Sequence, residues 1–240
     1  MLRVHFLQHW FNLFDSAAEA GLYDSRSMRR FVSIDLGHER VPDETIICKF
    51  RNFIEANNLG QQLFKLIQKY LGENGIKVHR GTIVDTTIIS ASSSTKNREG
   101  KRDPEMRQTR KGNQWYFGMK THVGVDSRTK LIHSMVATSA NVHNSQVLSK
   151  LLHGKKTQVY GDSTYMEQRE VIRSVVPAAR GFTQRRGSRY RKLIEGNRRR
   201  NRNKSRVHSK KKHPFLVIKK IFGFQKHVIV NYTRTLTGLM

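Results

Sequence analysis

The chain has 240 residues and carries 45 Lys or Arg against 18 Asp or Glu, so its formal net charge of +27 predicts an acidic partner. Hydrophobic residues make up 37% of the chain, which is enough to bury a core and argues against wholesale disorder. No apolar run reaches the roughly 20 residues that span a bilayer, and Cys48 is the only cysteine, so we expect a soluble, intracellular protein without disulfides or a cysteine-based zinc cluster.

The first 78 residues are predicted to form a small helical module. Asp43 is a candidate N-cap for the helix that follows it, where apolar residues recur at helical spacing. A second helix begins near Gln61 and stops at Gly72, and a further helical stripe runs from Val4 to Phe14. Core packing explains these stripes better than a direct catalytic role does.

The second predicted domain, residues 79–240, begins where the spacing of apolar residues changes from a helical pattern to one typical of strands. Residues 82–89 are almost all β-branched or aliphatic, as in a buried strand, and a polar loop follows them. Two more strands, over 115–125 and 131–137, are joined at the turn-like sequence DSRTK. The remaining predicted elements are a helix over 144–152 and a short strand over 158–160. This order predicts an α/β domain with a mixed sheet and flanking helices.

Two aspartates occupy unusual places in these predicted strands. Asp85 lies inside the aliphatic strand, where an unpaired carboxylate is costly to bury, and Asp162 directly follows a short strand. We expect the two strands to be neighbours, so that the carboxylates converge and suit divalent cations held between carboxylate and phosphate oxygens. The alternative for Asp162 is a simple cap of the helix that follows.

Aromatic and histidine residues give a weaker signal. Trp115, Tyr116 and Phe117 follow Arg110 and Lys111, a composition that suits stacking on nucleic-acid bases. Three consecutive aromatic residues at the start of a strand are more often part of a core, and core packing is the interpretation we favour. The histidines lack metal-ligand spacing, so we assign them no chemistry.

Most of the positive charge lies in the last third of the chain. Residues 151–240 contain 23 basic and 4 acidic side chains, whereas residues 1–80 contain 11 and 9. Such a run repels itself unless a polyanion neutralises it, and nucleic acid is the natural counter-ion; a solvated basic tail is the alternative. The apolar stretch FLVIKKIFGF that follows favours docking onto a core. The candidate DNA-binding residues are Arg198, Arg199, Arg200, Arg202, Lys204 and Arg206.

Several stretches, spread over nearly the whole chain, match a known pattern. They are MLRVHFLQHWFNL, DLGHERVPDETIICKF, GTIVDTTIISASSSTKN, RDPEMRQTRKGNQWYFGMKTHVGVD, SANVH, LLHG, YGDSTY and KSRVHSKKKHPFLVIKKIFGF. With them the chain resembles the DDE transposases of bacterial insertion sequences, specifically the family conventionally numbered five. The resemblance implies a ribonuclease-H-like catalytic domain after the helical module, with one Asp on the first strand, one Asp after the fourth and one Glu on a later helix.

In that family the three carboxylates bind Mg²⁺ ions that activate water or a DNA 3′ hydroxyl. Asp85 and Asp162 match the two family aspartates, so the resemblance implies that both are catalytic metal ligands. It also implies double-stranded DNA as partner, as element ends and as target, with a homo-oligomer as the active form. The place of action would be the bacterial cytoplasm, at the nucleoid.

One position departs from the family pattern. The family has Glu immediately before His-Pro-Phe, and this chain has Lys212 there, which cannot ligate a cation. Glu195, 17 positions upstream, would need a different helix register to replace it. Family members also have segments before MLRVHF and after FGF that we do not find. We therefore expect a truncated or degenerate copy.

Two functions of different classes follow from this pattern. The first is a metal-dependent transposase that cuts at element ends and joins them to target DNA. The second is a catalytically inactive, DNA-binding remnant that inhibits intact transposase, and Lys212 favours it. An RNA-associated basic protein is disfavoured, because the sequence has neither an RNP1-like run nor a KH-type GXXG.

Overall fold

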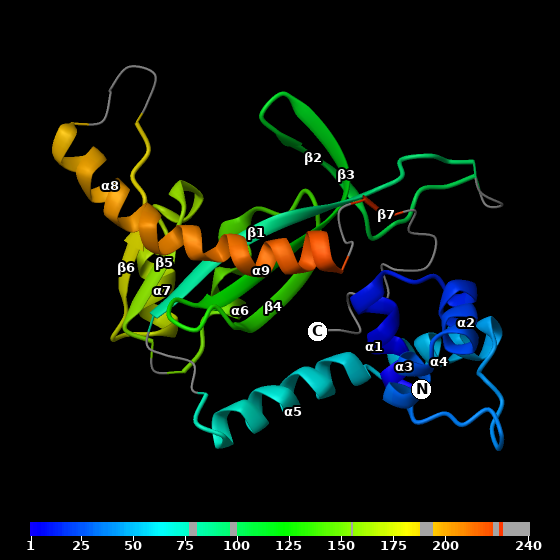
Figure 1. Ribbon diagram of the computed structural model, residues 1–240. Helices are drawn as coiled ribbons and strands as arrows, with labels where there is room; N and C mark the ends of the chain where they lie inside the picture. The colour runs from blue at the N-terminus through cyan, green and yellow to red at the C-terminus, as the bar shows by residue number, and fades with distance from the viewer. Residues whose placement is uncertain (77–80, 97–99, 155, 188–193, 223–225, 228–240) are drawn as a thin grey trace. The chain divides into compact units, whose positions relative to one another are not determined.

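The computed structural model in Figure 1 describes residues 1–76, 81–96, 100–154, 156–187, 194–222 and 226–227. These residues form two compact units. The helical unit consists of Met1–Leu66 with residues 216–222, and the sheet unit consists of Ile67–Phe215 with residues 226–227. The predicted domain boundary after residue 78 stays a prediction, because the chain passes from one unit to the other inside a continuous helix.

The helical unit confirms the expected N-terminal helical module. Its helices are α1 (Leu2–Phe11), α2 (Asp15–Asp24), α3 (Arg26–Val32), α4 (Glu44–Ala56), the first part of α5 (Leu59–Glu73) and the π-helix η4 (Val217–Ile221). Asp43 caps α4 as predicted, because its carboxylate accepts a hydrogen bond from the amide of Ile46 at 2.7 Å. Val4, Leu7 and Leu22 form the buried core with other apolar residues of these helices.

The sheet unit is built on a mixed sheet of seven described strands. They are β1 (Gly81–Ala91), β2 (Arg107–Lys111), β3 (Gln114–Asp126), β4 (Ile132–Ser139), β5 (Gln158–Gly161), β6 (Arg180–Thr183) and β7 (Lys226–His227). The order is β2-β3-β1-β5-β6, with β4 also paired to β3 and β7 to β1. Strands β1, β3 and β4 pair antiparallel, whereas β1, β5 and β6 pair parallel. This mixed α/β arrangement is consistent with the predicted ribonuclease-H-like fold.

Helices cover both faces of this sheet (Figure 1). The elements are the 3₁₀ turns η1 (Asn144–Val147), η2 (Ser163–Tyr165) and η3 (Ser209–Lys211) and the helices α6 (Leu148–Leu151), α7 (Arg169–Val175), α8 (Glu195–His208) and α9 (Lys212–Leu216). Val84 of β1 packs in the core formed with α6 and α7. Its neighbour Ile83 packs with Val207 of α8 and Phe215 of α9. Because successive residues of a strand point to opposite faces, α8 and α9 lie on the other side of the sheet. None of the described helices has the length and apolar character that a bilayer crossing requires.

A buried polar cluster lies where β1 begins and β4 begins. Nε2 of His133 is hydrogen-bonded to Oγ1 of Thr82 at 2.6 Å. Nδ1 of His133 is hydrogen-bonded to Nε2 of His153 at 2.7 Å. Burial, followed by the nearby Lys156 ammonium, lowers the pKa of His133 to about 3. The ring is therefore neutral in the folded protein at every pH above that value.

We expect this cluster to make the protein sensitive to acid. In the unfolded state the histidine has a pKa of about 6.5, whereas in the folded state the pKa of His133 is about 3. Between these two values the unfolded state binds a proton and the folded state does not, so the stability of the fold falls as the pH drops below about 6.5. By pH 5 the loss through His133 is about 2 kcal/mol relative to pH 7. Urea unfolding at both pH values checks this: His133→Gln should lose about 2 kcal/mol less than the parent chain. The exposed His143→Gln is the matched control, and an equal acid loss in both variants would contradict the prediction.

Candidate functional site

Asp85 lies in the middle of β1, and its side chain is only 6% exposed. It follows Ile83 by two residues and therefore lies on the same face of the sheet, the face that packs against Val207 and Phe215. Its antiparallel neighbour on β3 is Val123, which belongs to the same apolar cluster. The carboxylate is thus placed on the side of the sheet that the basic helix α8 covers.

The parallel pairing of β1 with β5 brings Asp162 to the neighbouring position. Ile83 pairs with Tyr160, and Asp162 follows Tyr160 by two residues just as Asp85 follows Ile83. Asp162 itself lies one residue past the end of β5, and paired strands are about 4.8 Å apart, so an extension of this register would place it beside Asp85. The predicted neighbourhood of the two strands is confirmed.

Tyr165 packs in the core that contains Val84, on the sheet face opposite to Asp85. Its side chain is fully buried beyond the end of β5, and Thr86 Oγ1 lies 3.3 Å from its hydroxyl. Burial raises the pKa of the Tyr165 phenol, and the negative charges of Asp85 and Asp162 both raise it further. One phenol therefore lies within electrostatic reach of both carboxylates.

Asp162 also caps the short turn that follows it, as the alternative interpretation proposed. Its Oδ1 accepts hydrogen bonds from the amide of Thr164 at 2.9 Å and from the Thr164 hydroxyl. Both bonds use the same carboxylate oxygen, so the cap fixes the orientation of the group without engaging Oδ2. Capping and a role in a site are therefore compatible. The spacing of Thr two residues after Asp in YGDSTY is the sequence signal for this turn.

The donor set fits a divalent cation in part. The carboxylates of Asp85 and Asp162 are ligands of the kind that Mg²⁺ prefers. Lys212 begins α9, on the layer that packs over the sheet face of Ile83, and it is exposed. Glu195 begins α8, about 25 Å away along the helical rise, and is paired with Arg202 at 2.9 Å. Within the described ranges, no group of three or more His, Cys, Asp or Glu side chains could hold a metal ion.

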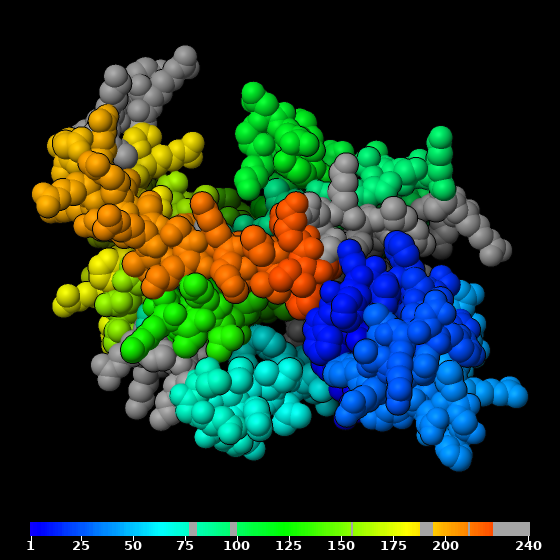
Figure 2. Space-filling view, viewed as in Figure 1, coloured from blue at the N-terminus to red at the C-terminus, as the bar shows by residue number. Residues whose placement is uncertain are grey.

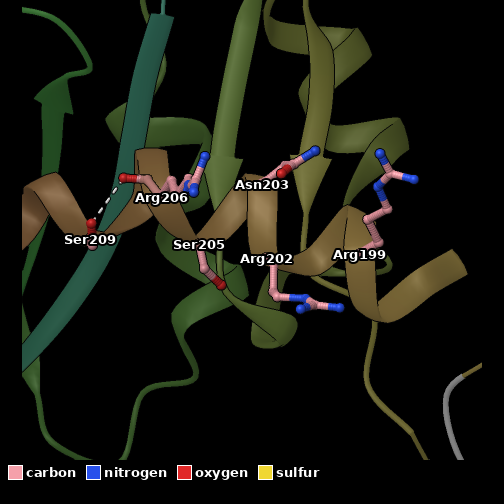
Figure 3. Close-up of a pocket in the computed structure, with 6 residues that line it drawn as sticks. All are labelled: Arg199, Arg202, Asn203, Ser205, Arg206 and Ser209. Atoms are coloured by element: carbon pink, nitrogen blue, oxygen red, sulfur yellow. Dashed lines mark hydrogen bonds between the residues drawn. The ribbon is translucent and has the colours of Figure 1, made fainter. Parts of the chain in front are cut away.

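Helix α8 carries six basic residues and one acid, and part of this charge lines a surface hollow. Arg199, Arg202 and Arg206 are spaced at helical intervals that place them on one side of the helix. Asn203, Ser205 and Ser209 complete the lining, as Figure 3 shows, and Ser209 donates a hydrogen bond to the Arg206 carbonyl at 2.9 Å. The hollow therefore offers guanidinium, amide and hydroxyl donors side by side.

Other residues of α8 hold the helix onto the sheet. Lys204 donates to the carbonyl of Thr183, at the end of β6, at 2.6 Å. Asn201 exchanges two hydrogen bonds with the backbone of Arg185, at 3.1 and 2.8 Å. Partial burial and the neighbouring arginines lower the pKa of Lys204. Lys204 thus holds α8 onto the sheet, and its predicted contact with DNA stays a prediction.

The three aromatic residues 115–117, for which we favoured core packing, do not all lie in the core. Trp115 is 64% exposed, and Tyr116 and Phe117 are only half-buried. The core interpretation is wrong for Trp115, because this end of β3 extends past β1 and pairs with β2 instead. Strand β2 itself was not predicted, since RQTRK lacks the apolar alternation of a half-buried strand.

Two family models match the sequence of this chain. Residues 76–236 match the family model described as Transposase DDE domain, and residues 1–53 match the model described as Transposase domain (DUF772). No solved structure matches the chain significantly. The first match covers more than half of the chain and includes Asp85, Asp162 and the whole of α8. The chain belongs to the DDE transposase family.

Proposed function

We propose that this chain is an insertion-sequence transposase of the family numbered five, which binds element ends and target DNA. Family membership and the parallel pairing of β1, which carries Asp85, with β5, which leads to Asp162, support the proposal. It acts in the bacterial cytoplasm on nucleoid DNA, and its active form is a homo-oligomer. The reaction of the family is DNA cleavage followed by strand transfer.

Asp85 and Asp162 are the residues that would hold a divalent cation such as Mg²⁺. A bound ion of this kind polarises phosphate oxygens and lowers the pKa of a bound water. The chain itself supplies orientation: the strand register sets the position of Asp85, and the cap by Thr164 fixes the carboxylate of Asp162. Burial of Asp85 limits the access of water to this part of the site.

Helix α8 is the DNA-binding element in this proposal. The arginines at 198, 199, 200, 202 and 206 contact phosphates, while Lys204 positions the helix through Thr183. Glu195 bridges Arg202 at 2.9 Å and Arg198 at 3.7 Å, both at exposed sites. Exposed ion pairs of this kind contribute about 0–1 kcal/mol, so phosphates can displace Glu195 easily.

A second candidate function, DNA binding without cleavage, is favoured by one observation. Lys212 stands where the family has its third carboxylate, and Glu195 is held at the far end of α8. The site therefore lacks one negative charge and gains a positive one. A chain of this kind would still occupy element ends, and it would inhibit an intact transposase by competition or by mixed assembly.

DNA binding is expected to be strong and steeply dependent on salt. Each phosphate contact adds about 0.9 to the slope of log K against log salt, so Arg199→Glu, Arg202→Glu and Arg206→Glu together should reduce the slope by about 2 to 3. The slope is measured by fluorescence anisotropy of a labelled duplex at KCl concentrations from about 50 to about 300 mM.

The matched control makes the same change in charge outside α8. Lys49, Lys65 and Lys150 are exposed, and their replacement by Glu alters net charge by the same amount. We expect the control to keep most of the slope. Equal losses in the two triple variants would show that net charge, and not the hollow on α8, determines binding.

A further inference from the structure

Strands β2 and β3 form a two-stranded ribbon that extends beyond the rest of the sheet. Residues 114–117 of β3 pair with β2, whereas the pairing with β1 begins at Gly118 and the pairing with β4 at Met119. In Figure 1 the ribbon leaves the sheet unit as a separate arm, and Figure 2 shows its green atoms standing out from the surface. Gly118 marks the exit: its φ is +148°, and a Cβ there would collide with the carbonyl oxygen of Ile89.

One face of this ribbon repeats a pairing of arginine with an aromatic ring. Arg110 lies opposite Trp115 in the register, and its guanidinium is 6.0 Å from the centre of the indole. Phe117 follows Trp115 by two residues on the same face, and the Arg102 guanidinium is 5.6 Å from its ring. The two rings are therefore about 6.6 Å apart along the strand, close to twice the 3.4 Å rise of stacked bases.

The charge of the ribbon has a single sign. Residues 106–125 contain no Asp or Glu; the exposed tip carries Arg110 and Lys111, and Arg107 lies at the foot of the ribbon, opposite Gly118. At the foot of the ribbon a second hollow is lined by Arg102, Arg107, Gln108, Phe117 and Asn141, among others. An anionic partner with flat apolar groups matches both the charge and the rings.

We propose that this face of the ribbon binds unpaired bases of single-stranded DNA, with one base stacked on Trp115. This inference rests on the proposed function, since it names a second contact with the same DNA. Trp115 is 64% exposed, and Arg110 covers one face of the indole, which leaves the other face for a base. In duplex DNA the faces of the bases are covered by their neighbours, and an indole has only one donor for base edges, so a duplex groove suits this side chain poorly.

The ribbon also has a defined reach from the two aspartates. Trp115 lies eight residues along β3 from Val123, the neighbour of Asp85. At about 3.3 Å per residue this is at most about 26 Å, the length of about eight stacked nucleotides. A strand end that is frayed next to the site could therefore extend to the tip of the ribbon.

Fluorescence of Trp115 tests the proposal directly. The chain has two tryptophans, so Trp10→Phe leaves Trp115 as the only tryptophan, whose emission is observed by excitation beyond the absorption of tyrosine. We expect a single-stranded oligonucleotide about 12 nucleotides long, enough to cover this reach, to quench its emission. A blunt duplex should bind without quenching, with binding followed independently by anisotropy of a label on the DNA.

Affinity measurements with matched variants complete the test. Trp115→Ala should weaken single-strand binding about 5- to 100-fold, whereas Trp115→Phe should largely preserve it. Tyr116→Ala is the control, because Tyr116 pairs with Thr109 on the other face of the same ribbon and should have no effect. Duplex affinity should be unchanged in all three variants.

The outcomes separate this inference from the proposed function. Binding of both DNAs with no quenching, and with no effect of Trp115→Ala, would overturn the inference and leave the proposed function standing. Quenching by the duplex alone would also overturn it, because the ribbon would then enter a groove. No binding of either DNA would overturn both proposals.

Discussion

Lys212→Glu is expected to raise DNA cleavage by about a hundredfold over the parent chain. Strand β1, which carries Asp85, pairs with β5, which leads to Asp162, and position 212 begins the helix that packs through Phe215 over the face of Ile83. The change removes a positive charge and adds a carboxylate ligand, a swing of two charge units. Misplacement of reacting groups alone costs about a hundredfold in rate, which sets the size of the expected gain. Nicking of a supercoiled plasmid that carries element ends, in the presence of Mg²⁺, measures it.

Two further variants separate charge from ligation. Lys212→Gln removes the positive charge without adding a carboxylate, so we expect only a small part of the gain. Asp85→Ala combined with Lys212→Glu should return cleavage to background. If the parent chain cleaves DNA efficiently and Asp85→Ala abolishes this cleavage, then Lys212 is tolerated at the site. The second candidate function, DNA binding without cleavage, would then be wrong.

The residues of the candidate site could be found from sequence because each broke a local pattern. Asp85 interrupts an aliphatic strand, and Asp162 directly follows a strand, so both depart from the local sequence pattern. Their position relative to one another could not be derived, because it depends on the register between β1 and β5, whose first paired residues, Gly81 and Gln158, are 77 positions apart in the sequence. The motif YGDSTY also predicts that Asp162 caps the turn that follows it.

The roles of exposed residues were harder to predict. Whether Trp115 is core or surface depends on where β1 stops pairing with β3, and the one local feature at that point, Gly118, does not by itself predict the end of a pairing. The sequence of the basic run is compatible with a solvated tail and with a DNA contact. Which side of helix α8 faces the sheet is fixed by hydrogen bonds between residues far apart in the sequence, such as that from Lys204 to the Thr183 carbonyl. Local composition therefore identified the surfaces, and long-range pairing decided which side chains face outward.

Asp15→Asn is expected to destabilise the helical unit by about 3 kcal/mol. Asp15, at the start of α2, accepts hydrogen bonds from both terminal nitrogens of Arg51 of α4, at 3.0 and 2.5 Å, and from Gln8 Nε2 of α1 at 2.7 Å. Arg51 is only 7% exposed, so the variant leaves a guanidinium in the interior without its bidentate carboxylate. Urea unfolding followed at Trp10, in a Trp115→Phe background, measures the change within this unit.

The same physics predicts that the damage is reversible by a second substitution. Asp15→Asn combined with Arg51→Met removes the buried charge as well as its partner, so it should cost less than Asp15→Asn alone. The exposed pair of Lys69 and Glu73, whose charged atoms are 3.8 Å apart, is the matched control, and Glu73→Gln should change stability by no more than about 0.5 kcal/mol. If Asp15→Asn costs as little as this control, or if the double variant is the less stable of the two, then the ion pair does not hold α1, α2 and α4 together, and the apolar core of the helical unit does so alone.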